Sequence, residues 1–187
     1  MKLFWVDVRP WNKKKVTTAL ESGADAVVTP AGHAAKVREL GLIQVVSDDG
    51  DLKPGADVLE VTIGNKADEE NAARLGATRT VIVHTADWAV IPLENLVAQA
   101  DGIIAAVETA EEARTAVQVL EKGVRGVLLV TDDLNEIKKT ARFIKQESEK
   151  LPLVEAEVAV VRKLGMGDRV CVDSCTNMGT GQGMLVG

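Results

Sequence analysis

The chain has 187 residues, of which 46% are hydrophobic and 27% are charged, and its formal net charge at pH 7 is -6. The hydrophobic fraction supports a sizeable core and excludes a disordered protein, while the absence of any apolar run near the roughly 20 residues of a membrane helix argues against a transmembrane protein. Acidic and basic residues are interspersed without a basic block, so binding to nucleic acid or to an anionic membrane surface is not expected.

Seven short runs of aliphatic and β-branched residues predict β-strands. They lie at residues 3–8, 26–29, 43–47, 57–63, 79–85, 102–108 and 126–131. Most of these runs are apolar without alternation, a pattern typical of parallel strands that are covered on both faces. An eighth strand is considered over residues 153–161.

Amphipathic stretches separate these runs and predict helices, most of which end at a glycine suited to a left-handed cap. The predicted helices cover residues 12–22, 32–40, 67–75, 110–122 and 135–150. The alternation of strand and helix implies an α/β fold with right-handed crossovers. The number of strands favours a (β/α) TIM-barrel-like parallel domain, with an open doubly wound sheet as the alternative. The connection from Ser47 to Asp57 is too short for a crossover helix, so we expect it to be irregular.

The pattern changes after Pro152, where apolar and polar residues alternate between glycine-containing turns. Such alternation is typical of half-exposed antiparallel strands. We therefore expect a barrel-like domain at residues 1–150 and the start of a β-rich domain at 151–187. Cys171 and Cys175 lie too far apart along an extended strand for a disulfide, and no second cysteine pair accompanies them. We expect reduced thiols, no metal site and a cytoplasmic location.

Polar side chains follow almost every predicted strand, at the end of the sheet where α/β proteins bind their ligands. The site candidates at these ends include Asp7, Arg9, Lys13, Lys14, Lys15, Glu60, Lys66, His84, Glu108 and Asp132. Each has a structural alternative. The three adjacent lysines suit a solvated first helical turn, and His84 suits a hydrogen-bonded structural histidine. No GxGxxG motif follows the first strand, so no sequence motif by itself identifies a bound cofactor.

Three stretches of the sequence resemble one known family. They are FWVDVRPWNKKKV and ALESGADAVV near the amino terminus and the glycine-rich stretch 165–187, which contains GDRVCVD and GMLVG. These residues resemble the archaeal-type 3-dehydroquinate synthase, the second, NAD-dependent kind of that enzyme. The resemblance runs from end to end. Because chains of that family continue past GMLVG, it implies the amino-terminal half of a longer enzyme.

The resemblance also implies an activity and a cofactor. Members of the family are NAD-dependent oxidoreductases that convert 2-amino-3,7-dideoxy-D-threo-hept-6-ulosonate into 3-dehydroquinate by oxidative deamination and ring closure. This reaction lies on the shikimate route to aromatic amino acids. Such a small-molecule substrate carries an ammonium, a carboxylate and a ketone but no phosphate. These groups suit a rim that is rich in both acids and lysines, and a homo-oligomer is left open.

The residues at the strand ends can be matched to the steps of that reaction. The candidate catalytic residues are Lys13, Lys14, Lys66 and His84. A lysine that loses its proton near neutral pH could deprotonate the substrate ammonium, and His84 could transfer protons during ring closure. The candidate substrate-binding residues are Asp7, Arg9 and Glu60. The two acids would hold the ammonium, and Arg9 would bind the carboxylate as a bidentate pair.

Two alternatives from other functional classes stay open. The chain could be a non-catalytic module that pairs with a separate chain through an exposed apolar edge at residues 184–186. It could also be an aldolase-like barrel in which a lysine forms a Schiff base with the substrate.

Overall fold

The computed structural model describes residues 2–85, 93–120, 122–146, 159–162 and 165. The chain divides into two compact units, Met1–Leu151 and Pro152–Gly187, and the helices and strands below belong to the first. Most of the eighth strand considered at 153–161, the β-rich segment expected at 151–187 and both cysteines lie outside the described residues.

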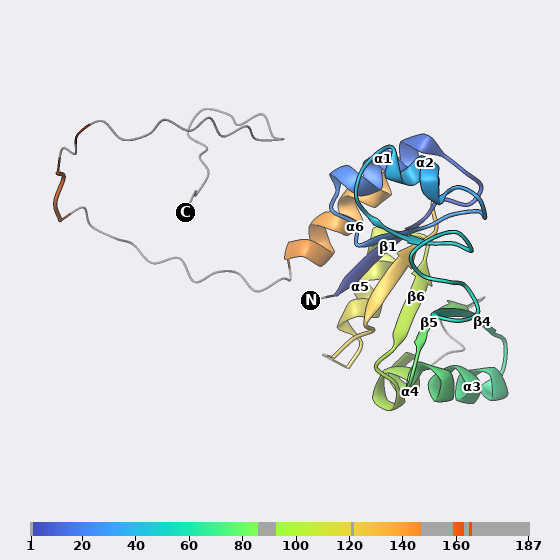
Figure 1. Cartoon of the computed structure of the whole chain (residues 1–187). Helices are drawn as coiled ribbons and strands as arrows, with labels where there is room; N and C mark the ends of the chain where they lie inside the picture. The colour runs from blue at the N-terminus through green and yellow to red at the C-terminus, as the bar shows by residue number, and fades with distance from the viewer. Residues whose placement is uncertain (1, 86–92, 121, 147–158, 163–164, 166–187) are drawn as a thin grey trace. The chain divides into compact units, whose positions relative to one another are not determined.

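All seven predicted strands are present in one parallel sheet. They are β1 (Leu3–Asp7), β2 (Ala26–Val28), β3 (Gln44–Val46), β4 (Val58–Ile63), β5 (Thr80–Thr85), β6 (Ile103–Val107) and β7 (Gly126–Leu129). Their order is β3-β2-β1-β7-β6-β5-β4, so the last strand lies beside the first. An open doubly wound sheet would instead place β4 beside β1. The order is that of a curled, barrel-like α/β sheet, and the predicted fold class is confirmed (Figure 1).

The short connection between β3 and β4 is irregular, as the sequence predicts. It contains no crossover helix, and two isolated parallel bridges, Val46 with Leu52 and Pro54 with Val58, tie it to both neighbouring strands. The turn into it requires glycine, because a Cβ atom on Gly50 would lie 2.4 Å from the carbonyl oxygen of Val45. Leu52 then packs against the apolar residues inside the curled sheet. The connection therefore lines the gap between the two edge strands.

Among the described residues, six helices accompany the sheet. They are α1 (Lys13–Glu21), α2 (Ala34–Arg38), α3 (Lys66–Gly76), α4 (Leu93–Gln99), α5 (Ala110–Gln118) and α6 (Leu134–Gln146). Asn12, Asn65 and Thr109 cap the starts of α1, α3 and α5, since each side chain accepts hydrogen bonds from backbone N–H groups of the first turn. The sequence did not predict α4. None of the described helices is long and apolar enough to cross a membrane.

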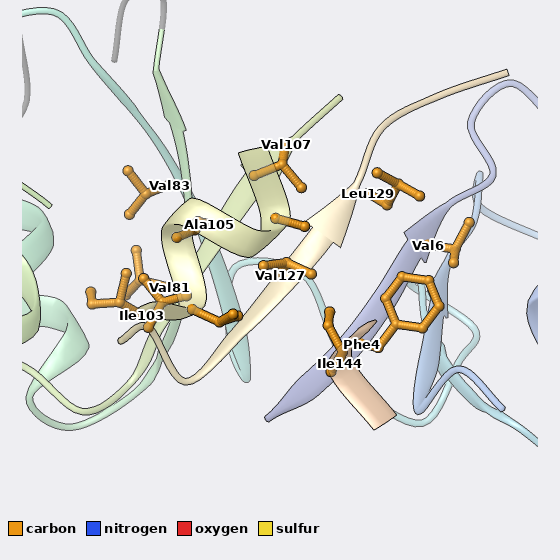
Figure 2. Packing of buried hydrophobic residues seen from close by; sticks show 14 of the residues in the cluster. Phe4, Val6, Val81, Val83, Ile103, Ala105, Val107, Val127, Leu129 and Ile144 are labelled. Atoms are coloured by element: carbon orange, nitrogen blue, oxygen red, sulfur yellow. The ribbon is translucent and has the colours of Figure 1, made fainter. Parts of the chain in front are cut away.

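Alternate residues of each strand pack on opposite faces of the sheet, which gives two apolar layers. The larger layer lies between the sheet and the helices, and Figure 2 shows it around Phe4, Val81, Val127 and Ile144. The smaller layer lies on the other face. Its buried members are Trp5, Ala26, Val28, Val46, Val58, Ile82, Ile104 and Leu128. We call this second face the inner face, because the sheet curls around it.

Replacement of Phe4 by alanine tests the helix-facing layer. Phe4 is fully buried there, and deletion of a buried aromatic side chain typically lowers the free energy of unfolding by about 3–5 kcal/mol. We expect Phe4→Ala to show a loss of this size in urea denaturation followed by circular dichroism. Leu42→Ala is the control, because Leu42 is 99% exposed and its loss should change the free energy by less than about 0.5 kcal/mol. Equal effects of the two substitutions would contradict the assignment of the core.

Candidate functional site

Three of the predicted site residues share the inner face at the carboxyl end of the sheet. Asp7 follows Trp5 by two residues on β1, and His84 follows Ile82 by two residues on β5, so each has the orientation of an inner-face residue. Glu60 has the same relation to Val58 on β4. Strand alternation therefore directs all three polar side chains to the concave side of the sheet, above the apolar layer.

Arg9, just beyond β1, joins these side chains into one hydrogen-bonded chain. Its Nη2 and Nε atoms lie 2.7 Å from Asp7 Oδ2 and 3.0 Å from Asp7 Oδ1. Its Nη1 atom donates to Glu60 Oε1 at 2.9 Å, and His84 Nε2 lies 3.0 Å from Glu60 Oε2. We call Asp7, Arg9, Glu60 and His84 the mouth cluster. The structure brings together four of the seven predicted site residues.

The contact between Arg9 and Glu60 depends on the curl of the sheet. Three strands separate β1 from β4 in the hydrogen-bonding order, so in a flat sheet the two would lie about 19 Å apart, at a spacing of about 4.8 Å between neighbours. Their side chains nevertheless meet at 2.9 Å. The mouth cluster is therefore a contact across the inside of a curled sheet.

The ionisation of Glu60 determines which ring nitrogen of His84 carries the hydrogen. The hydrogen bond from His84, together with those from Arg9, lowers the pKa of Glu60 from 4.5 to about 2, although partial burial of the carboxyl raises it. Glu60 is thus ionised at neutral pH and can only accept hydrogen bonds. His84 Nε2 must carry the hydrogen, and in a neutral imidazole this leaves Nδ1 as the nitrogen that can accept a proton.

Arg9 is held in place by the two acids on either side of it. Hydrogen bonds to Asp7, and then to Glu60, raise the pKa of its guanidinium above its usual range. Two of its three nitrogens contact Asp7, and both terminal nitrogens contact Glu60. Little of its hydrogen-bonding capacity is left for a ligand. Asp7, Arg9 and Glu60 together carry a net charge of about -1 when all three are ionised.

Two adjoining hollows lie at this end of the sheet and share Glu108 and Val130. The histidine hollow, about 270 Å³, is lined by His84, Thr85, Ala106, Val107, Glu108, Glu112 and Val130. The lysine hollow, about 490 Å³, is lined by Arg9, Lys15, Glu108, Thr109, Val130, Thr131, Asp132 and Glu136. The mouth cluster contributes a side chain to each of them. Together they offer a concave, charged surface of the size that small ligands use.

The three predicted catalytic lysines do not line these hollows. Lys13 and Lys14 are exposed on the first turn of α1, and Lys66 is exposed at the start of α3. Their catalytic role stays a prediction. The lysine that lines a hollow is Lys15, whose side chain is 3% exposed and whose Nζ lies 3.2 Å from Asp132 Oδ1.

The sequence contained a signal that distinguishes Lys15 from its two neighbours. Lys15 lies three and four residues before Thr18 and Ala19, so all three share one face of α1. That face is buried, together with Val16. Helical spacing alone would therefore have directed Lys15 inward and left Lys13 and Lys14 in solvent. Glu108 was among the strand-end residues, but its position in both hollows was not apparent from the sequence.

NAD is the cofactor that the family resemblance implies, and its diphosphate requires free backbone N–H groups or available cations. The described starts of α1, α3 and α5 are already capped by the chain's own side chains. The hollows are lined by four carboxylates, Glu108, Glu112, Asp132 and Glu136. Since these four acids outnumber Lys15 and Arg9, the two cations of the hollows, and repel a doubly charged diphosphate, the two hollows do not fit NAD, and no NAD contact is assigned to them. Within the described residues, no group of His, Cys, Asp or Glu is placed to hold a metal ion.

Comparison with protein families identifies the relatives of the chain. A family model described as the 3-dehydroquinate synthase II N-terminal domain matches residues 1–144, and the model of the C-terminal domain matches residues 155–187. The chain belongs to the 3-dehydroquinate synthase II family. The resemblance recognised in the sequence is confirmed.

Curated relatives support the same family. The chain is 57% identical to the 3-dehydroquinate synthase of Methanoregula boonei and 54% identical to that of Methanoculleus marisnigri, over all 187 residues of this chain. It is 50% identical to a 3-dehydroquinate synthase homolog of Aquifex aeolicus. The matches cover 56%, 56% and 57% of these relatives, so the chain spans about half of their length.

Solved structures support the barrel-like fold. A phosphoribosyl anthranilate isomerase in complex with reduced 1-(o-carboxyphenylamino)-1-deoxyribulose 5-phosphate matches with a TM-score of 0.58 at 14% identity, over 78% of this chain and 100% of that chain. A monomeric form of the isomerase from Thermotoga maritima matches with a TM-score of 0.59 at 13% identity and the same coverage. At such low identity the likeness concerns the fold alone.

The shifted pKa of Glu60 predicts a pH-dependent contribution to stability. Because the pKa lies at about 2 in the folded chain against 4.5 ordinarily, the unfolded state binds more protons between these values. The stabilisation by ionised Glu60 is therefore complete above about pH 4.5 and is lost as the pH falls toward 2. We expect Glu60→Gln to be less stable than wild type at pH 7, and the difference in free energy of unfolding to shrink on acidification. Urea denaturation from pH 7 to pH 2.5 measures it, and a difference independent of pH would contradict the ionised pair.

Proposed function

We propose that the protein is a 3-dehydroquinate synthase of the second kind. In this proposal it converts 2-amino-3,7-dideoxy-D-threo-hept-6-ulosonate into 3-dehydroquinate by oxidative deamination and cyclisation, with NAD as the oxidant, in the shikimate pathway. Membership of the 3-dehydroquinate synthase II family supports the reaction. The observation that carries the assignment of residues is the hydrogen-bonded mouth cluster beside the two hollows. Because the chain spans about half of its relatives, this activity is proposed for the complete protein.

His84 is the proposed proton carrier. Ring closure of a keto acid that also bears a methyl ketone requires a base to take a proton from the carbon beside one carbonyl, while the other carbonyl oxygen gains a proton as the carbon–carbon bond forms. His84 lines the histidine hollow, and its Nδ1 can accept a proton because Glu60 holds Nε2 as a donor. Glu60 also stabilises the imidazolium that results, as a carboxylate paired with histidine does in other enzymes.

The acids of the mouth cluster are proposed to attract the substrate ammonium. Their net charge of about -1, counting Arg9, favours a cation over an anion. Arg9 would then position Asp7 and Glu60, because its guanidinium is already engaged with both carboxylates. A substrate carboxylate bound to Arg9, which the sequence suggested, would have to share that guanidinium with two acids. The substrate ammonium therefore matches the mouth cluster better than the substrate carboxylate does.

Substitution of His84 tests the proposed proton transfer. We expect His84→Asn to lower kcat for 3-dehydroquinate formation by about 10²- to 10⁴-fold, the usual contribution of a general base. The assay should use this chain joined to the remainder of the Methanoregula boonei enzyme, with NADH absorbance and product formation measured separately. NADH formation with lost cyclisation would place His84 in ring closure alone. Full turnover by His84→Asn would remove it from the mechanism.

The lysine prediction is tested in the same assay by three separate alanine substitutions, at Lys13, Lys14 and Lys66. If one of these lysines deprotonates the substrate ammonium, its replacement should lower kcat by at least about 10²-fold. The loss should be partly restored by added primary amine. Retention of turnover by all three variants would exclude a base at these positions, while leaving the proposed overall reaction untouched.

A further inference from the structure

Lys15 is a buried cation whose only ion-pair partner among the described residues is a solvent-exposed acid. The Lys15 side chain is 3% exposed, whereas the Asp132 side chain that contacts it is 92% exposed. Burial of a charged group is costly unless it is paired. An exposed carboxylate offers a weak pair, because water competes with it and it is free to move away. The burial of Lys15 is therefore better explained by an anion that enters the site than by Asp132 alone.

The surroundings of Lys15 point to the same conclusion. Lys15 lines the lysine hollow, where the other cation, Arg9, is already engaged by Asp7 and Glu60. A lysine ammonium has three N–H donors, and Asp132 accepts one of them at 3.2 Å. Lys15 is thus the cation of this hollow with capacity left for an incoming carboxylate. The Asp132 carboxylate occupies the position that such a ligand would take.

We propose that Lys15 binds the carboxylate of an α-amino acid substrate in the lysine hollow and that this carboxylate displaces Asp132. The inference rests on the proposed function in one respect, namely that the ligand carries both a carboxylate and an ammonium. The ammonium of the ligand, on the carbon that also bears the carboxylate, then lies toward the net negative charge of the mouth cluster, whose Arg9 also lines the lysine hollow. This arrangement assigns the carboxylate to Lys15, which the sequence placed among the strand-end candidates but not among the predicted substrate-binding residues.

A pair of ligands that differ only in the carboxylate tests the assignment. The probes are 2-aminoheptanoate and its methyl ester, which keeps the ammonium and loses the negative charge. Binding of each to the 187-residue chain is followed by chemical-shift titration. The wild-type chain should bind the acid about tenfold or more tightly than the ester, as expected for a charge-assisted hydrogen bond. Absence of binding of the acid, or equal affinity for acid and ester, overturns the proposal.

Substitutions at Lys15 determine whether it causes this preference. Lys15→Met keeps the buried aliphatic chain and should make the affinities for acid and ester equal, whereas Lys15→Arg keeps the charge and should retain the preference. Lys138→Met, at an exposed position on α6, is the control and should behave as wild type. Melting temperatures of all variants show whether the fold is intact. A preference for the acid that survives in Lys15→Met overturns the proposal.

Substitution of Asp132 should raise the affinity for the acid, whereas loss of the Lys15 charge should lower it. If Asp132 competes with the ligand for Lys15, Asp132→Asn should raise affinity for the acid by several-fold and leave that for the ester nearly unchanged. In the Lys15→Met background the same substitution should bring little gain, which separates competition for Lys15 from a general change in charge. Asp48→Asn, an exposed site on the β3–β4 connection, is the control. A gain in the double variant equal to that in the single variant overturns the displacement of Asp132.

These outcomes are distinguishable from failure of the proposed reaction. Binding of the acid that depends on Lys15, combined with no NAD-dependent turnover by the complete protein, would keep the carboxylate site and reject the proposed function. Turnover of the amino sugar acid with unchanged KM in Lys15→Met would keep the function and reject Lys15 as the carboxylate partner.

Discussion

The ion pair between Arg9 and Glu60 depends on the curl of the parallel sheet, and the rest of the site depends on that pair. Strands β1 and β4 lie four positions apart in the sheet, yet Arg9, just after β1, contacts Glu60 of β4 at 2.9 Å. The same glutamate accepts from His84, so a single carboxylate connects β1 to β5 across the inner face. A flat sheet of the same strands would separate these groups beyond reach. Curvature is thus what converts polar strand ends into a cluster.

Much of the fold follows from the sequence because its signals are local. Uniformly apolar runs predict doubly covered strands, and the helices predicted at residues 12–22 and 110–122 are present as α1 and α5. Helix α4 was missed, although Leu93, Leu96 and Val97 have helical spacing and are buried. The pairing of β7 with β1 joins residues more than a hundred positions apart, and it could be favoured only by counting strands. The irregular connection at Leu52 could be anticipated by its length but not by its packing inside the sheet.

The sequence predicted which residues form the site better than it predicted which of them contact one another. Alternation places Asp7, Glu60 and His84 on one face, and the structure brings them together around Arg9. The sequence could not show that Arg9 is already engaged by two carboxylates, since that depends on β4 reaching β1. Nor does a run of three adjacent lysines reveal which one turns inward until the buried stripe of its helix is considered. Lys15 emerged for that reason, whereas Lys13 and Lys14 remain in solvent.

The face of helix α1 that packs in the core also carries Lys15. Val16 and Ala19 are fully buried, and the helix packs on β1 and α6. A change in the side chains beneath this helix would shift or rotate it, and the ammonium of Lys15 would move with it by a similar amount. Packing and recognition are thereby coupled in one element. During evolution, substitutions in the core residues beneath α1 would therefore also affect ligand binding. We expect such substitutions to be accompanied by compensating substitutions among the residues around Lys15.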